Sequence, residues 1–224
     1  METLAEDLLL LGLDDESGAV SWQHATALPY GLGGALLMDL TLLGRLGTAG
    51  GLVTVVDPSP TGDTVLDAAL AMIRAASRPR DATHWVRALG ERAGLREELA
   101  RRLVARGILR EEERSFLRVF HSERFPTGDP DPELALRGRI REVTLAGVPS
   151  DDRTLMLISL VNACGLTDVL FTRDERGAAK RTIKALVEGE QFGKAVGKAV
   201  AAVVAAVAAT SAAYTVVVAP GAHH

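Results

Sequence analysis

Cysteine is nearly absent from this chain: Cys164 is the single one among 224 residues. One thiol excludes an intramolecular disulfide, and it also excludes a zinc site made of cysteines alone. Cys164 closes the apolar stretch 155–164, a setting typical of a small buried core residue. We therefore expect neither a disulfide framework nor a thiolate metal centre.

Aromatic residues are also scarce, at 4% of the chain, while hydrophobic residues make up 47% and charged residues 24%. This balance is typical of a folded globular protein. With so few rings, the core must be filled by aliphatic side chains such as Leu, Val and Ala, which favours helices packed on helices. The composition therefore predicts a mainly α fold.

Positive charge is not in excess, because the formal net charge is −4. A generic nucleic-acid binder gains its affinity by neutralising phosphates, so we expect no nucleic-acid partner. Any anionic ligand must be bound by a local basic patch.

A long, strongly apolar run is missing as well. Residues 199–220 carry no charge, and the segment approaches the length needed to span a bilayer, about 20 residues. It consists mainly of Ala and Val, however, which makes it a weak candidate for membrane insertion. A buried final helix is the favoured interpretation, and membrane contact is the alternative. The N-terminus has no secretory signal pattern, which predicts a cytoplasmic location. His223 and His224 are typical of an expression tag and enter no metal argument.

Capping residues and hydrophobic periods divide the chain into helices with little strand. Thr3 with Glu6 forms a capping box, residues 52–56 predict a short strand, and the alternation over about 108–125 predicts a projecting β-hairpin. We expect a single compact domain over residues 1–222. The predicted helices cover about 4–12, 26–46, 61 or 63 to 76, 81–90, 95–106, 133–146, 151–164, 173–188 and 191–212.

Catalytic motifs are absent. The glycines at 31, 33 and 34 lack the spacing of a dinucleotide fingerprint and no Lys follows them, so they indicate close helix packing. There is no Gly-x-Ser-x-Gly, and the histidines at 24, 84 and 121 are not paired at metal-ligand spacing. We expect a protein that is not an enzyme and holds no cofactor and no metal. An undetected enzyme would need a cleft with two coupled titratable groups.

One stretch, residues 91–124, is locally basic, with nine arginines against seven glutamates. A solvated helix face would look much the same for most of them. Arg96 differs, because the helical period places it on the side of Leu99 and Leu103, whereas Arg101 and Arg102 lie away from that side. A guanidinium at the edge of an apolar stripe needs a partner. That partner is either a carboxylate of the protein or an anionic ligand.

Four patterns resemble the Golgi phosphoprotein 3 family in order and spacing. They are the Leu-rich first helix, the run Gly31–Leu40, the run Pro60–Leu70 with its Pro-Thr-Gly-Asp start, and the run Leu99–Leu109. The resemblance covers nearly the whole chain and implies a mainly helical fold with a β-hairpin used in self-association. It also implies binding of phosphatidylinositol 4-phosphate on membranes, through a tryptophan and three arginines in the eukaryotic members.

When the pocket residues of the family are placed on this sequence by position, only part of the pocket is matched. Trp22 resembles its tryptophan and Arg96 matches one arginine, while the other two arginine positions fall on Gly33 and Ala93. Two of the four pocket positions are therefore kept, and only a shift of Arg92, which lies beside Ala93, restores a third position. The predicted ligand-binding residues are therefore Trp22, Arg92 and Arg96.

The resemblance implies a peripheral membrane protein on the inner face of the membrane that binds an anionic phospholipid head group. Phe116, Leu117 and Phe120 of the hairpin are the expected membrane or oligomer contacts. A short chain rich in Ala and Arg, without the arginine-containing tail of eukaryotic members, resembles bacterial and in particular actinobacterial members. A soluble helical adaptor that binds protein partners without lipid is the alternative.

Overall fold

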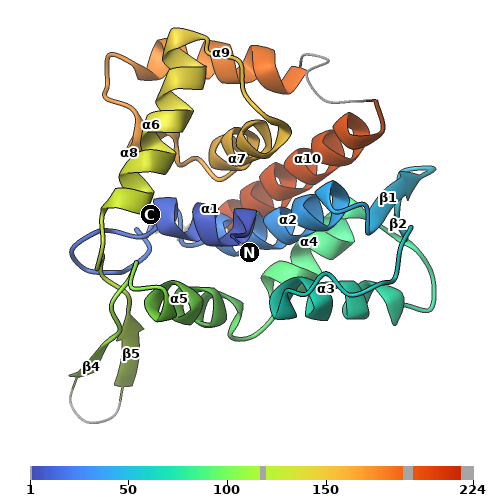
Figure 1. Cartoon of the computed structure of the whole chain (residues 1–224), viewed down its shortest axis with the longest axis horizontal. Coiled ribbons are helices and arrows are strands. Elements are labelled where there is room, and N and C mark those ends of the chain that lie inside the picture. Colours follow the sequence, from blue (N-terminus) through green and yellow to red (C-terminus); the bar gives the residue numbers. More distant parts are fainter. Residues whose placement is uncertain (1, 117–119, 189–193, 218–224) are drawn as a thin grey trace, which may run out of the picture.

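The structure is a computed structural model that describes residues 2–116, 120–188 and 194–217. Ten helices and two small antiparallel sheets lie within these ranges, which confirms the predicted mainly α class with a projecting hairpin (Figure 1). The helices are α1 (Leu4–Gly12), α2 (Ala27–Leu42), α3 (Thr64–Arg74), α4 (Ala82–Gly90), α5 (Leu95–Ala105), α6 (Asp131–Ala146), α7 (Asp152–Ala163), α8 (Thr167–Leu170), α9 (Arg176–Glu188) and α10 (Lys194–Val217). The strands are β1 (Leu46–Ala49), β2 (Leu52–Val55), β3 (Arg80–Asp81), β4 (Glu112–Phe116) and β5 (Phe120–Arg124).

Helix α2 occupies the centre of the molecule. Thirteen of its 16 residues are buried, and it packs against α1, α3, α4, α7 and α10. A helix that is apolar on every side belongs in a core, where neighbours cover each face. In Figure 1, α3 and α5 lie on one side of the α1–α2 pair, and α7, α6 and α9 lie on the other.

Three glycines let the neighbours of α2 approach its backbone. A Cβ atom on Gly31 would lie 2.3 Å from Cys164 Sγ, and one on Gly33 would lie 2.5 Å from the Val86 carbonyl oxygen of α4. A Cβ atom on Gly34 would meet a valine of α10 at 2.8 Å. These separations are too short for any side chain, so the prediction that the glycines serve close helix packing is confirmed.

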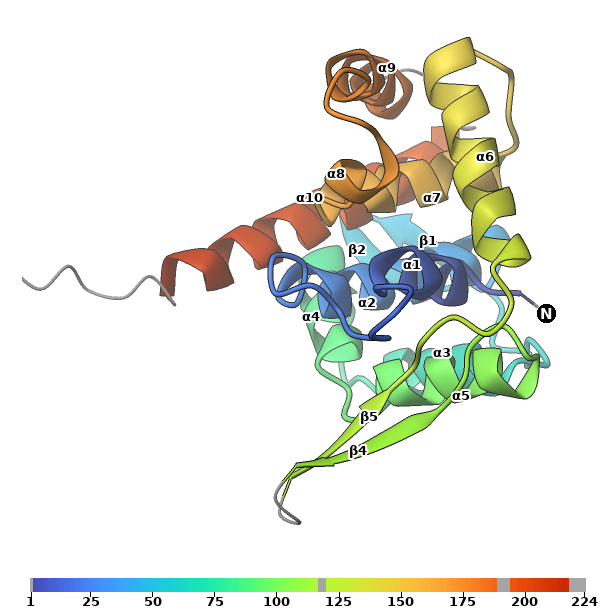
Figure 2. The ribbon, with the colours of Figure 1, turned by 90° about the vertical axis from the view of Figure 1, so that its left-hand side faces the viewer.

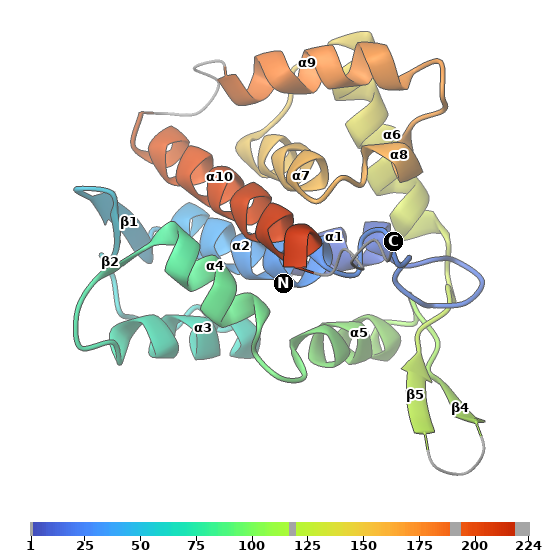
Figure 3. The same ribbon diagram turned by 180° about the vertical axis from the view of Figure 1, so that it is seen from behind.

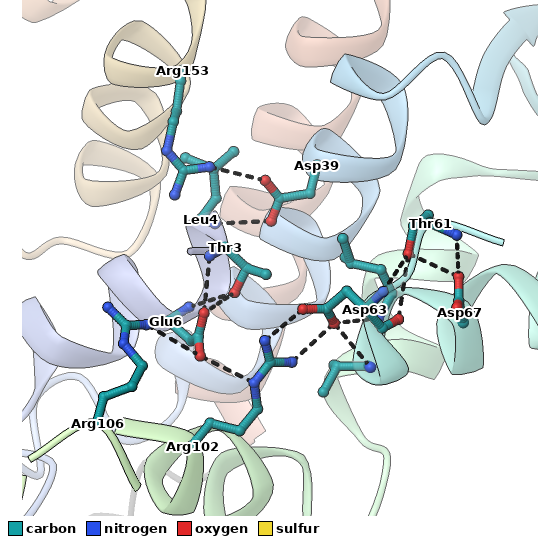
Figure 4. A network of polar contacts seen from close by, with 12 residues as sticks. Thr3, Leu4, Glu6, Asp39, Thr61, Asp63, Asp67, Arg102, Arg106 and Arg153 are labelled. Carbon is teal, nitrogen blue, oxygen red and sulfur yellow. Dashed lines mark hydrogen bonds and ion pairs between the residues drawn. The ribbon is translucent and has the colours of Figure 1, made fainter. Parts of the chain in front are cut away.

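Two buried carboxylates, one in α1 and one that caps the start of α3, are held by arginines in and just after α5 (Figure 4). Glu6 closes the predicted capping box with Thr3 and lies 3.1 Å from Arg102 Nε. Arg102 also donates through both terminal nitrogens to Asp63, whose Oδ1 caps α3, and Arg106 reaches Glu6 at 3.6 Å. The helical period of α5 correctly places Arg102 away from the apolar stripe of that helix. It cannot predict the partners of Arg102, because they come from other segments of the chain.

A second buried pair of acids meets one arginine of α7. Arg153 donates to Asp7 at 2.7 Å and to Asp39 at 3.3 Å, and Asp39 also accepts the backbone N–H of Leu4 at 2.8 Å. Asp7 and Asp39 are almost fully buried. These contacts tie α1, α2 and α7 together through charge as well as through packing.

The three-stranded sheet has the order β1-β2-β3 and covers one end of the helical body. Gly50 and Gly51, both with positive φ, form the two-residue turn that joins β1 to β2. The sequence predicts the second strand but extends the preceding helix to residue 46. That expectation is wrong, because α2 ends at Leu42 and the left-handed Gly44 turns the chain into β1.

The hairpin of β4 and β5 projects from the helical body beside α5, as Figure 2 shows. Its described rungs run from Glu112 opposite Arg124 to Phe116 opposite Phe120. The bridge between Leu109 and Thr127 continues the pairing at its base. The expected hairpin over about 108–125 is therefore confirmed.

Helix α10 packs across α2, α4 and α7, as seen from behind in Figure 3. Val200, Val203, Ala206 and Val207 are buried on its inner face, so the prediction of a buried final helix is confirmed. Within the described ranges, no helix combines the length and apolar character that a membrane span requires.

The arginine network makes a stability prediction. Arg102→Ala leaves Asp63 without its cation and leaves Glu6 with only the longer contact to Arg106, and we expect the free energy of unfolding to fall by about 2–4 kcal/mol. Arg101→Ala is the matched control, because Arg101 is exposed and its ion pair with Glu111 is long; it should cost less than about 1 kcal/mol. Urea unfolding measures both. Equal losses in the two variants would contradict the network.

The Arg153 cluster makes a prediction about pH. Burial raises the pKa of Asp39 to about 7 and that of Asp7 to about 6, although Arg153 opposes both shifts. The folded state then binds protons that the unfolded chain has already released, so stability increases as pH falls from 7.5 to 5.5, by on the order of 1–2 kcal/mol. Thermal unfolding should show the melting temperature rising over this range, and rising less in Asp39→Asn. A decrease in the wild type, or an unchanged rise in the variant, contradicts this assignment.

Candidate functional site

A hollow of about 270 Å³ lies where the first turns of α2 meet the segment that joins α4 to α5. Its walls are mostly apolar, and its charged groups come from the α4–α5 segment and the first turn of α5. The lining residues are Val20, Ala25, Leu28, Pro29, Leu32, Gly90, Arg92, Gly94, Leu95, Arg96 and Glu97.

Two glycines shape the segment that carries the charges. A Cβ atom on Gly90 would lie 2.6 Å from the Pro29 carbonyl oxygen, so the end of α4 rests on the backbone of α2. Gly94 adopts a left-handed φ of 77° immediately before α5, which reverses the chain after Arg92 and before Arg96. The two arginines therefore reach the same hollow from either side of one turn.

Both arginines have carboxylate partners within the protein. Arg96 lies against its neighbour Glu97, with Nε at 3.0 Å and Nη2 at 2.8 Å from the same oxygen. Arg92 Nη2 lies 2.6 Å from Glu98 Oε2. The sequence allows two kinds of partner for Arg96, a carboxylate of the protein or an anionic ligand. In this structure the partner is a carboxylate of the protein.

These ion pairs lie at the surface. The side chains of Arg96 and Glu97 are 38% and 31% exposed, and Arg92 and Glu98 are also in contact with solvent. Pairs of this kind contribute about 0–1 kcal/mol, because water screens the attraction and two side chains must be held still. An incoming anion can therefore replace either glutamate at little cost.

Trp22 lies in the turn between Val20 and Ala25, two residues of the hollow, and is 82% exposed. Its ring does not line the hollow itself. An indole so fully in water loses the burial that normally stabilises a tryptophan. The structure thus places Arg92 and Arg96 together and Trp22 on the adjoining turn.

Gly33 and Ala93, the two positions at which the family resemblance places pocket arginines, differ in their surroundings. Ala93 is exposed beside Arg92, so a longer side chain has room there. Gly33 is buried against the backbone of α4, where even a methyl group meets Val86 O at 2.5 Å and Gly90 N at 2.7 Å. Gly33 therefore cannot carry a head-group arginine unless α4 moves.

The hairpin residues are only partly placed. Phe116 and Phe120 are opposite each other in the backbone register of the last described rung, while Leu117 lies outside the described residues. Their role in membrane or oligomer contact stays a prediction.

Sequence reasoning missed Glu97 and Glu98 as partners of the two arginines. It assigned both to a solvated helix face, and the Arg92–Glu98 pair spans six positions across a helix start, outside the helical i, i+4 rule. In the described ranges, no group of three or more His, Cys, Asp or Glu side chains is arranged to hold a metal ion.

The fold and hollow define a mainly helical domain with a projecting hairpin and an arginine-rimmed pocket at the end of its central helix. The family model described as Golgi phosphoprotein 3 (GPP34) matches residues 4–206, and the chain belongs to this family. It is similar to the vacuolar protein sorting-associated protein 74 of Eremothecium gossypii, with 31% identity over 163 residues, covering 63% of this chain and 48% of that protein. The protein of the same name from Schizosaccharomyces pombe is 30% identical over 174 residues, covering 68% of this chain and 51% of the relative.

The chain thus spans about half the length of these curated relatives. Family membership confirms the resemblance drawn from the four sequence patterns. The expected bacterial origin stays a prediction.

The close contact between Gly33 and α4 predicts that even a small side chain at this position lowers stability. Gly33→Ala forces α4 away from α2, and we expect a loss of about 1–3 kcal/mol in the free energy of unfolding. Gly138→Ala is the matched control, since Gly138 lies in α6 with nothing within 4 Å of its added Cβ. Alanine there should stabilise by about 0.5–1 kcal/mol. Urea unfolding tests the pair, and a Gly33→Ala variant as stable as the wild type would refute the contact.

Proposed function

We propose that this protein is a peripheral membrane protein, docked at the cytoplasmic face, whose hollow at Arg92 and Arg96 binds the head group of an anionic phospholipid. The observation that carries the proposal is the exposed Trp22 on the turn beside this hollow. Tryptophan is enriched at membrane–water interfaces, where its ring lies among the head groups and its N–H stays hydrated. Insertion of Trp22 would bring a head group to the arginines.

The charges of the hollow favour a singly charged phosphate. Arg92 and Arg96 supply two guanidinium groups, and Glu97 and Glu98 already balance them. A phosphodiester can displace the carboxylates from the guanidinium groups and form charge-assisted hydrogen bonds in their place. A phosphomonoester carries more charge and calls for further donors, which Gly33 and Ala93 do not provide.

The charges of the hollow rank its candidate ligands. Phosphatidylglycerol, cardiolipin and phosphatidylinositol carry phosphodiesters alone, whereas phosphatidylinositol 4-phosphate adds a phosphomonoester for which the hollow offers no further donors. We therefore expect the first three lipids to bind at least as well as phosphatidylinositol 4-phosphate. The family resemblance alone implies the reverse order. The freed carboxylates of Glu97 and Glu98 can accept hydrogen bonds from hydroxyl groups of a glycerol or inositol head group.

The second candidate is a soluble adaptor that binds protein partners and no lipid. The intramolecular pairs of Arg92 and Arg96 favour it, because they satisfy both guanidinium groups without an external anion. Self-association through β4 and β5 is compatible with either candidate and stays a proposal. Neither candidate involves catalysis.

Vesicle co-sedimentation tests the proposal. Vesicles of phosphatidylcholine are compared with vesicles that also contain phosphatidylglycerol, cardiolipin, phosphatidylinositol or its 4-phosphate, at low and moderate salt. We expect binding to the anionic vesicles, weakened about tenfold by Arg96→Gln through the loss of a charged hydrogen bond. Glu97→Gln should strengthen binding, because it removes the competing carboxylate.

Arg173→Gln is the control, since Arg173 is exposed and lies far along the chain from the hollow. Its binding should equal that of the wild type. Absence of binding to every anionic vesicle at both salt concentrations removes the lipid proposal and leaves the adaptor. Equal losses in Arg96→Gln and Arg173→Gln would show general charge attraction instead of a site.

A further inference from the structure

A second hollow, of about 440 Å³, lies at the other end of α4, between the end of α3 and strand β2. Val53 and Val55 of β2, Ile73 of α3 and Trp85 of α4 form its apolar walls. The segment that joins α3 to β3 bounds it, and Figure 3 shows this segment curving outward beyond α3. The proposed lipid site uses none of these residues.

The charge of this hollow is uncompensated. Arg74 and Arg78 line it, and among the described residues no carboxylate forms an ion pair with either. Arg74 has one long hydrogen bond, 3.4 Å to the Pro58 carbonyl oxygen, which leaves its other donors available. Residues 68–80 contain three arginines and no acidic residue, although the whole chain is negatively charged. Arg92 and Arg96 of the first hollow, in contrast, are both paired.

Strand β2 also has an unpaired backbone rung facing this hollow. Val56 donates its backbone N–H to Arg45 O on the β1 side, so the backbone groups of Val55 point to the opposite side by strand alternation. Pairing with β3 ends at Val53, opposite Arg80, and within the described residues no backbone hydrogen bond reaches Val55 from that side. A peptide N–H is therefore available at the wall of the hollow.

Trp85 adds a third sign of an incomplete site. Trp85 is 4% exposed, and its indole N–H has no hydrogen-bond partner among the described residues. A buried donor without an acceptor costs about 1–3 kcal/mol, so native proteins seldom keep one without a reason.

We propose that this second hollow binds a phosphomonoester joined to an apolar body. Two guanidinium groups without counter-ions match the dianion of a phosphomonoester, whereas one carboxylate would neutralise only one of them. The valines, Ile73 and the Trp85 ring accommodate the apolar part. The ligand is a soluble phosphate ester or the phosphomonoester head group of a lipid, and both present the same chemistry to Arg74 and Arg78.

The experiment uses Trp85 as the reporter. Trp22 and Trp85 are the two tryptophans of the chain, so Trp22→Phe leaves Trp85 as the sole tryptophan. In this background, phenyl phosphate, inorganic phosphate and benzyl alcohol are titrated separately, as are vesicles with and without phosphatidic acid. We expect a saturable change in Trp85 fluorescence with phenyl phosphate, weaker binding of inorganic phosphate and no response to benzyl alcohol.

The same titrations in variants locate the site. Arg74→Gln and Arg78→Gln, both at exposed positions, should weaken binding of phenyl phosphate at least tenfold, while Arg173→Gln and Arg96→Gln leave it unchanged. A response to phosphatidic acid vesicles beyond that to phenyl phosphate identifies the lipid as the source, and the opposite order identifies a soluble ester. No saturable response to any phosphate probe, or equal affinity in Arg78→Gln and Arg173→Gln, overturns the proposal. Because Arg96→Gln affects only the first hollow, the two sites can fail independently.

Discussion

The backbone contact between α2 and α4 is the constraint from which the rest of the structure follows. Gly33 and Gly90 leave no space for a side chain, so the two helices touch at their peptide groups. This contact fixes where α4 ends, and the turn at Gly94 then delivers α5 to its place beside α1. From there Arg102 reaches Glu6 and Asp63, and burial of those acids joins three helices that are distant in sequence (Figure 4).

The same contact decides what the first hollow can bind. By closing the position of Gly33, it limits the arginines of the hollow to Arg92 and Arg96, and each already has a glutamate partner. The proposed exchange of a carboxylate for a phosphodiester fits this arrangement, because the hollow lacks the converging charges that a phosphomonoester calls for. The second hollow has the opposite character, because among the described residues no carboxylate forms an ion pair with Arg74 or Arg78, and the buried indole N–H of Trp85 has no acceptor. The arginines at the two ends of α4 thus lie in different charge environments.

Much of this fold can be predicted from local sequence signals. The Thr3–Glu6 box, the packing role of the glycines at 31, 33 and 34, and the hairpin near 108–125 depend on residues close together in the chain, and the structure confirms each. The four-residue helix α8 was not predicted, because one helical turn has too few residues to show a period. The partners of Arg102 and Arg153 lie on other helices, and the hollow of Arg74 and Arg78 forms only when α3, β2 and α4 meet. Arg96 could be chosen from its place on the helix, but its pairing with Glu97 could not.

In the proposed function, the guanidinium groups of Arg92 and Arg96 leave their glutamates to bind a phosphodiester head group. NMR of the arginine Nε–Hε groups tests this directly, during titration with a short-chain phosphatidylglycerol below its micelle concentration. We predict saturable shifts of the Arg92 and Arg96 signals with one common affinity, while the Arg173 signal stays unchanged. Unchanged Arg92 and Arg96 signals at saturating lipid, or shifts spread equally over all arginines, would contradict the account.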